Sequence, residues 1–230
     1  MPRPGLHAIL AAGIGIIFAP QAPQAKESLP EGAMATPPAA VEAREAPGRK
    51  QAIFAGGCFW GIEAVFSHLK GVTSVVSGYH GGEKRDAIYD VVGTGRTGHA
   101  EAVRVTYDPA VIRYDQLLRV FFAVGANPTQ LNYQGPDKGP QYRNALVPLG
   151  VEQKRVAAGY LAQLRRLDLW KKPIVTGVEP YRAFYPAEAY HQDFADRNPD
   201  HGYIKRWDVP KLRALKALFP DLYKPDFTRN

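Results

Sequence analysis

The chain of 230 residues contains very little cysteine: Cys58 is the only one. A lone thiol cannot form an internal disulfide, and it cannot build a cysteine-based metal site by itself. The sequence also lacks any run of five or more basic residues, although its formal net charge is +7. Scattered lysines and arginines indicate a solvated surface with mild affinity for anions. The sequence therefore predicts neither a disulfide framework nor a nucleic-acid partner.

The apolar stretch near the N-terminus is too short for an ordinary membrane span of about 20 residues. It covers Ala8–Ala19, follows Arg3 and precedes small residues and prolines up to Ala25. This order is typical of a secretory signal. A proline stands third before a cut after Ala22 or Ala25, so an uncleaved membrane anchor stays open as an alternative. We predict a signal over residues 1–25 and a periplasmic or secreted protein.

Residues 26–50 are rich in Ala, Pro and Glu and show neither strand nor helix periodicity. We expect them to form a flexible linker. A folded domain should follow over residues 51–205, with a C-terminal extension, residues 206–230, packed on it. The composition is 45% hydrophobic and 22% charged, which is ordinary for a folded soluble protein.

Hydrophobic periodicity within the domain predicts an irregular mixture of strands and helices. Strands are expected at 51–55, 72–79, 101–107, 143–149 and 173–178, and helices at about 59–69, 114–122 and 151–167. A Gly/Pro/Asn-rich loop is expected over 125–141, and irregular structure from Tyr185 to Asn230. Because strands and helices do not alternate strictly, we expect an α+β fold, a two-layer ferredoxin-like α/β sandwich with irregular loops and a C-terminal extension.

Cys58 stands between glycines and two aromatic residues, at the predicted start of a helix. A thiol held at a helix N-terminus should have a lowered pKa and act as a nucleophile. The alternative is that Cys58 is a small buried hydrophobic side chain, which is the commoner fate of a free cysteine.

Glu101 shares a predicted strand face with Val103 and Val105, and this face should be buried. A carboxylate in an apolar site has its pKa raised, so it can hold a proton near neutral pH and donate it. The alternative is a buried glutamate that pairs with a nearby arginine or lies at the open end of the strand.

Six short motifs appear in order along the chain. They are Gly57-Cys58-Phe59-Trp60-Gly61, Ser77-Gly78-Tyr79, Thr97-Gly98-His99-Ala100-Glu101, Gln141-Tyr142-Arg143, Phe184-Tyr185-Pro186-Ala187-Glu188 and Tyr190-His191-Gln192. With this content and order, the chain resembles the A-type peptide methionine sulfoxide reductases from about Gln51 to Pro199.

The resemblance implies a role for each matching residue. Cys58 would attack the sulfoxide sulfur, and Glu101 would protonate the departing oxygen. Tyr89 and Tyr142 would polarise that oxygen through their hydroxyl groups. The remaining matches concern substrate binding: Phe59 and Trp60 would form an apolar wall for the substrate methyl group, and Asp137 would help to position the substrate backbone.

Purely structural roles are the alternative for several of these residues. Tyr89 and Tyr142 could be ordinary half-buried tyrosines, and Trp60 could belong to the core alone. His99 lies beside Glu101 in sequence, but we interpret it as structural, because a metal site usually needs three or four ligands. We therefore predict no metal site.

The chain departs from the family pattern close to the site. Ala126-Asn127-Pro128 stands where many members have His-Asp-Pro, Tyr133 replaces a common arginine, and Asn144 replaces a serine. The C-terminal cysteines of many members are absent. These changes could alter substrate preference or rate, but they touch none of the proposed catalytic groups.

The implied activity is reduction of methionine S-sulfoxide, free or in oxidised proteins, which leaves Cys58 as a sulfenic acid. With no second cysteine, an external thiol must reduce it, either a thioredoxin-like protein or a small thiol. We expect no bound cofactor and a monomeric enzyme. Two alternatives remain open: a one-cysteine peroxidase that uses the same thiol, and a non-catalytic binding module that keeps the family fold.

Overall fold

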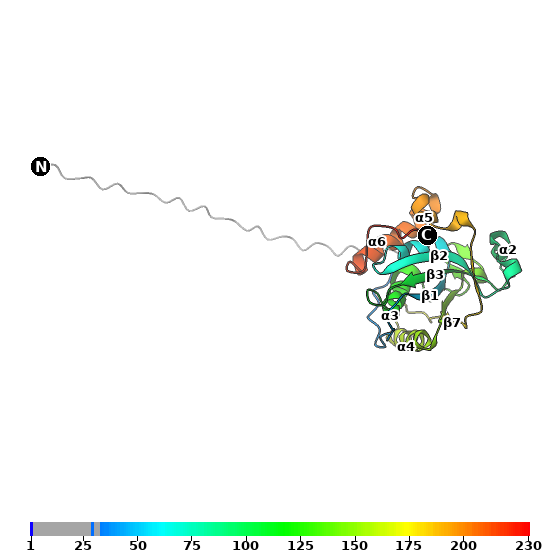
Figure 1. Ribbon diagram of the computed structural model, residues 1–230, viewed down its shortest axis with the longest axis horizontal. Helices are drawn as coiled ribbons and strands as arrows, with labels where there is room; N and C mark the ends of the chain where they lie inside the picture. Colours follow the sequence, from blue (N-terminus) through cyan, green and yellow to red (C-terminus); the bar gives the residue numbers. More distant parts are fainter. Residues whose placement is uncertain (2–28, 30–32) are drawn as a thin grey trace.

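The computed structural model describes residues 1, 29 and 33–230 (Figure 1). Apart from Met1, the predicted signal over residues 1–25 lies outside the described residues. In the described part of the chain, no helix is long and apolar enough to cross a membrane.

A mixed sheet forms the centre of the domain (Figure 1). In the described residues its strand order is β7-β6-β1-β3-β2-β8, and neighbours are antiparallel except β6 and β7. The strands are β1 (Lys50–Gly56), β2 (Val72–His80), β3 (Ala100–Tyr107), β6 (Asn144–Val147), β7 (Gly177–Val178) and β8 (Phe184–Pro186). A separate hairpin pairs β4 (Tyr133–Gln134) with β5 (Asp137–Lys138).

Two crossover helices define the topology. Helix α1 (Phe59–Ser67) connects β1 to β2, and α3 (Tyr114–Val120), continued by the π-helical turn η2 (Phe121–Gly125), lies between β3 and β6. The order β6-β1-β3-β2 with these crossovers is that of a ferredoxin-like sandwich, which confirms the expected α+β class. Helix α4 (Val151–Leu167) has the bounds that its periodicity predicts.

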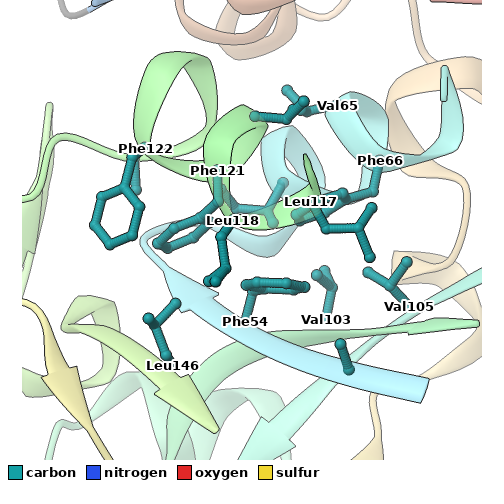
Figure 2. Packing of buried hydrophobic residues seen from close by; sticks show 14 of the residues in the cluster. Phe54, Val65, Phe66, Val103, Val105, Leu117, Leu118, Phe121, Phe122 and Leu146 are labelled. Atoms are coloured by element: carbon teal, nitrogen blue, oxygen red, sulfur yellow. The ribbon is translucent and has the colours of Figure 1, made fainter. Parts of the chain in front are cut away.

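The main core lies between one face of the sheet and these helices (Figure 2). Phe54 of β1 lies at its centre. The Phe54 ring stacks on Phe66 of α1 with centroids 4.8 Å apart, and it contacts Phe121 at 5.4 Å. Val103 and Val105 of β3 point into the same layer. The alternation along β3 therefore turns Glu101 toward the helices as well.

Short elements surround this sandwich. They are η1 (Lys84–Asp86), α2 (Tyr89–Gly93), η3 (Pro140–Tyr142), η4 (Ala189–His191), α5 (Phe194–Arg197), η5 (Ile204–Asp208) and α6 (Val209–Leu218). Three expectations need correction. Of the strand expected at 173–178, only Gly177–Val178 forms a strand. The segment 125–141 contains the β4–β5 hairpin, and the supposedly irregular C-terminal stretch contains α6. Val209, Leu212, Leu215 and Leu218 recur at every third position, and Pro210 lies in the first helical turn, a position that proline favours.

The last residues of the chain lie against the end of α1. The Lys224 N–H donates to the His68 carbonyl at 2.8 Å, and the Thr228 N–H donates to the Ser67 carbonyl at 3.0 Å. These bonds satisfy carbonyls that a helix leaves free at its C-terminus.

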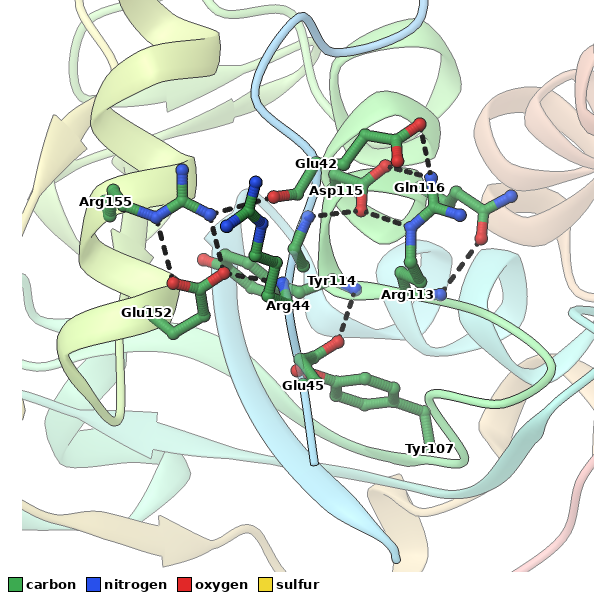
Figure 3. Close-up of polar contacts among 11 residues, drawn as sticks. Glu42, Arg44, Glu45, Tyr107, Arg113, Tyr114, Asp115, Gln116, Glu152 and Arg155 are labelled. Carbon is green, nitrogen blue, oxygen red and sulfur yellow. Dashed lines mark hydrogen bonds and ion pairs between the residues drawn. The ribbon is translucent and has the colours of Figure 1, made fainter. Parts of the chain in front are cut away.

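Residues 33–49, which we call the N-terminal arm, do not form a flexible linker, and that expectation is wrong for this part of the segment. Thr36 and Ala43 are buried, and the Ala43 N–H donates to Asp115 at 2.9 Å. Glu45 accepts hydrogen bonds from the Tyr107 hydroxyl and the Tyr114 N–H (Figure 3). Low-complexity composition suggested disorder, but side chains of the domain satisfy the backbone of the arm.

The arm should therefore contribute to the stability of the domain. Glu45→Ala leaves the Tyr107 hydroxyl and an N-terminal N–H of α3 without their acceptor, which should cost about 1–3 kcal/mol of unfolding free energy. Urea unfolding measures this loss. Glu42→Ala is the matched control, because Glu42 is exposed and forms a surface ion pair with Arg113, worth about 0–1 kcal/mol. Equal, small effects of both changes would show that the arm does not support the fold.

Candidate active site

Cys58 lies at the junction of β1 and α1, where it is the N-cap residue of the helix. Two glycines precede it. Gly57 has φ +89°, and a Cβ there would lie 2.4 Å from the Gln134 side chain. A Cβ on Gly56 would lie 2.7 Å from Ala126. Only glycines let the chain turn this tightly against the 126–134 loop, and the turn leaves the Cys58 side chain half-buried.

Glu101 lies directly beside this junction. Its carboxyl Oε2 accepts a hydrogen bond of 3.1 Å from the Phe59 N–H, in the first turn of α1. The residue is 2% exposed, and burial raises the pKa of Glu101 to about 8, although the Phe59 hydrogen bond lowers it. At neutral pH the carboxyl therefore holds a proton, as the strand pattern predicted, and no arginine pairs with it among the described ion pairs.

The expectation of a lowered cysteine pKa is wrong for this structure. Burial raises the pKa of the Cys58 thiol above its ordinary value, and the carboxylates of Glu101, Asp208 and Asp137 raise it further. The Trp60 N–H at the helix N-terminus lowers this pKa, but by less. The helix field is present, yet desolvation and negative charge outweigh it.

Two tyrosines complete the polar side of the site. Tyr89 begins α2, and the Glu188 carboxylate accepts its N–H at 2.9 Å. Burial raises the pKa of Tyr89 to about 12, with further contributions from Glu101 and Cys58. Burial and the charge of Glu101 likewise raise the pKa of Tyr142, at the end of η3. Both hydroxyls are therefore neutral donors near the thiol and the acid.

The two aromatic residues after Cys58 differ in solvent exposure. Phe59 is buried, with its ring centroid 5.0 Å from His191 and 6.4 Å from Tyr89. Trp60 is half-buried and stacks on Phe194 with centroids 3.8 Å apart. The Trp60 indole N–H donates to His191 Nδ1 at 3.1 Å. These contacts hold the indole in one orientation, with part of its surface open.

Asp137 of β5 is the last predicted site residue. Its carboxylate accepts a hydrogen bond from the Tyr203 hydroxyl. Burial raises the pKa of Asp137, and the Lys211 ammonium lowers it. The charge of Asp137 acts on Cys58 and Glu101, so the hairpin brings this residue to the same site.

Sequence reasoning missed several residues of this site. Glu188 and His191 were part of the recognised motifs but received no role, although they hold Tyr89 and Trp60. Tyr203 and Asp208 lie in the stretch that was expected to be irregular. The three-residue spacing of apolar side chains in α6 was the signal that could have placed this segment against the site.

His99 has the structural role that we expected. Its Nδ1 accepts the Gly82 N–H at 3.1 Å, and its Nε2 lies 3.0 Å from the Glu83 carbonyl. Both ring nitrogens therefore bind backbone. Within residues 33–230, no group of three or more His, Cys, Asp or Glu side chains is arranged to hold a metal ion.

The residues that depart from the family pattern lie behind the junction. The Asn144 side chain donates to the Asn127 carbonyl at 2.9 Å, and Gln134 donates to the same carbonyl at 2.8 Å. Since Gln134 packs on Gly57, the two asparagines support the loop that backs Cys58. Tyr133 is 38% exposed.

Comparisons with known proteins agree with this geometry. The family model described as "Peptide methionine sulfoxide reductase" matches residues 50–221. The chain is 55% identical over 183 residues to "Peptide methionine sulfoxide reductase MsrA 2" of Mesorhizobium japonicum, covering 80% of this chain and 94% of the relative. It is 50% identical over 173 residues to MsrA of Deinococcus radiodurans, covering 75% and 84%.

Solved structures give the same result. The fold is similar to reduced Mxr1 of Saccharomyces cerevisiae, with a TM-score of 0.61 and 32% identity over 70% of this chain and 92% of that one. It is also similar to methionine sulfoxide reductase A of Corynebacterium diphtheriae, with a TM-score of 0.57 and 32% identity over 74% and 89%. These matches favour the reductase over the peroxidase and the binding module.

The raised pKa of Cys58 can be measured directly, because the chain has one thiol. Alkylation by iodoacetamide follows the thiolate fraction. The native protein should react more slowly at pH 7.5 than the urea-unfolded chain, and its rate should still be rising above about pH 8.5, the ordinary thiol pKa. A native profile with its midpoint below that of the unfolded chain would contradict this description of the site.

Proposed function

The chain belongs to the peptide methionine sulfoxide reductase family, and we propose that Cys58 is its nucleophile and Glu101 its general acid. The enzyme reduces methionine sulfoxide to methionine with electrons from a thiol. One observation carries the assignment: a neutral carboxyl hydrogen-bonds to the first turn of the helix that Cys58 begins. The thiol and the proton donor therefore stand at one place.

The first half of the cycle reduces the substrate and oxidises the enzyme. Cys58 gives up its proton and attacks the sulfoxide sulfur, while Glu101 donates a proton to the sulfoxide oxygen. The attack forms an S–S bond, and the oxygen, which takes up the protons of Glu101 and Cys58, leaves the substrate sulfur as water. Water then attacks the Cys58 sulfur and breaks the S–S bond, so methionine leaves, Cys58 becomes a sulfenic acid and one proton returns to Glu101. Two electrons have passed from Cys58 to the substrate.

The other predicted residues bind the substrate in this proposal. The neutral hydroxyls of Tyr89 and Tyr142 donate hydrogen bonds to the sulfoxide oxygen, which gains negative charge in the transition state. The open part of the Trp60 indole, backed by Phe59, receives the methyl group. Asp137, fixed by Tyr203, accepts a backbone N–H of the substrate.

The substrate is the S epimer, free or in oxidised proteins. All the proposed groups come from one chain, which supports activity as a monomer.

An external thiol must complete the cycle. The sulfenic acid condenses with the first thiol to form a mixed disulfide and water, and a second thiol then releases Cys58. With Cys58 as the only cysteine, no internal disulfide can form. We propose a thioredoxin-like protein or a small thiol as the donor. Export by the N-terminal signal would place this cycle in the periplasm or outside the cell. Cell fractionation of the full-length chain would then detect the protein in the periplasmic or extracellular fraction.

Glu101→Gln tests the acid. The amide keeps the shape but has no transferable proton, so kcat/KM should fall about 10²–10⁴-fold. In the wild type, kcat/KM should decline as the pH rises through about 8, because the carboxyl loses its proton. This decline should be absent from the variant.

Glu83→Gln is the matched control, since Glu83 is a largely exposed carboxylate and its change should leave the rate and the pH profile as in the wild type. A wild-type rate and pH profile in Glu101→Gln would exclude the proposed acid.

The dependence of the proposed cycle on a thiol donor gives a second test. Without any thiol donor, the enzyme should release one methionine per enzyme molecule and stop, with Cys58 trapped by a sulfenic-acid reagent. Addition of dithiothreitol should restore steady turnover, and Cys58→Ser should give no burst, because a hydroxyl is a far poorer nucleophile. Sustained turnover without a donor, or an active serine variant, would refute the cycle.

A further inference from the structure

A buried ion pair is packed against the first turn of α1. Asp208, the last residue of η5, has a side chain that is 1% exposed, and its Oδ1 lies 3.4 Å from the Lys211 Nζ in α6. A Cβ built on Gly61 would lie 2.1 Å from this oxygen and 2.7 Å from the same ammonium. Only a glycine at the third position of α1 leaves room for the pair.

Stability does not explain this pair. Apart from the ammonium, neither Asp208 oxygen has a hydrogen-bond partner in the described part of the chain. A buried carboxylate without donors costs free energy, and a buried ion pair rarely offsets the loss of hydration. The position next to the turn that carries Cys58 therefore calls for another explanation.

The surroundings of Cys58 are otherwise acidic or neutral. The carboxylates that act on its thiol are Glu101 from β3, Asp208 from η5 and Asp137 from β5. The Lys211 ammonium from α6 acts on Asp208 and Asp137. The hydroxyls of Tyr89, Tyr142 and Tyr203 near these groups are neutral. Among the described ion pairs, Lys211 is the cation that contacts one of these carboxylates.

We propose that Asp208 and Lys211 are positioning residues for the reaction: the carboxylate fixes the ammonium beside the first turn of α1 and balances its charge, so that the pair sets how readily Cys58 loses its proton. The proposal rests on the assigned role of Cys58, but its test reads the thiol itself. It concerns residues that touch neither the sulfoxide nor the attacking sulfur.

The test is the alkylation rate of Cys58 as a function of pH in charge variants of the full chain. Asp208→Asn removes the balancing charge and leaves the ammonium, which should favour the thiolate. A shift of one pKa unit corresponds to about a tenfold faster alkylation at a fixed pH below the thiol pKa. Asp208→Asn/Lys211→Met also removes the ammonium and should cancel this gain.

A surface pair supplies matched controls. Lys205 and Asp200 lie 2.7 Å apart with side chains 58% and 92% exposed. Asp200→Asn and Lys205→Met change the net charge equally and should leave alkylation unchanged. A purely structural role of the buried pair would not produce a gain that the second substitution reverses.

Two results would overturn the proposal: an alkylation rate in Asp208→Asn no higher than in Asp200→Asn, or a gain that persists in the double variant. Near-ultraviolet circular dichroism checks that each variant is folded. If Asp208→Asn fails to fold, Lys211→Met alone decides, because removal of the cation should make Cys58 slower. A thiol as fast as or faster than that of the wild type in this variant would also overturn the proposal, whereas a slower thiol would support it.

Discussion

One hydrogen bond, from the Phe59 N–H to the Glu101 carboxyl, fixes the position of the acid relative to the thiol. It forms only because β1 turns into α1 within two glycines, and because β3 lies beside β1 in the sheet. The pairing of Ala55 with Ala102 sets the register. A slip of one residue would turn Glu101 to the opposite face of the sheet, away from Cys58. The hydrogen bond between Phe59 and Glu101 therefore depends on the glycines, the strand order and the register together.

The electrostatics of the site follow from the same burial. Burial and neighbouring carboxylates raise the pKa values of both Cys58 and Glu101, so both groups hold protons before the substrate arrives. Such a site is a poor source of free thiolate, but it suits a substrate that brings its own proton acceptor. The sulfoxide oxygen is such an acceptor, and protonation of that oxygen makes the sulfur easier to attack. The absence of a permanently ionised thiolate also limits oxidation of Cys58 by other oxidants.

Periodicity predicted the parts of the site that regular elements determine. The alternation along β3 placed Glu101 in the buried layer, and the apolar spacing after Cys58 predicted α1. Tyr89 begins the five-residue helix α2 and Asp137 begins the two-residue strand β5. Elements this short show no period in the sequence, so only the resemblance identified these two residues. The predicted sign of the Cys58 pKa shift was wrong because the helix field is local, whereas burial of the thiol and the carboxylates of Glu101 and Asp208 depend on distant parts of the chain. The prediction of a flexible N-terminal arm was wrong for a related reason. The composition of the arm does not reveal the donors elsewhere in the chain that bind Glu45.

The single cysteine imposes an order on the whole cycle. In the proposed cycle, the sulfoxide and the reducing thiol both react at the Cys58 sulfur, and each reaction consumes the form of Cys58 that the other produces. Methionine must therefore leave before the thiol can attack, and we infer a ping-pong sequence with the sulfenic acid between its halves. The groups that assist the first half also remain during the second. Water leaves Cys58 when the thiol condenses with the sulfenic acid, and a neutral Glu101 can protonate that departing oxygen just as we propose for the sulfoxide oxygen. The acid fixed by the Phe59 hydrogen bond thus fits both halves of the cycle.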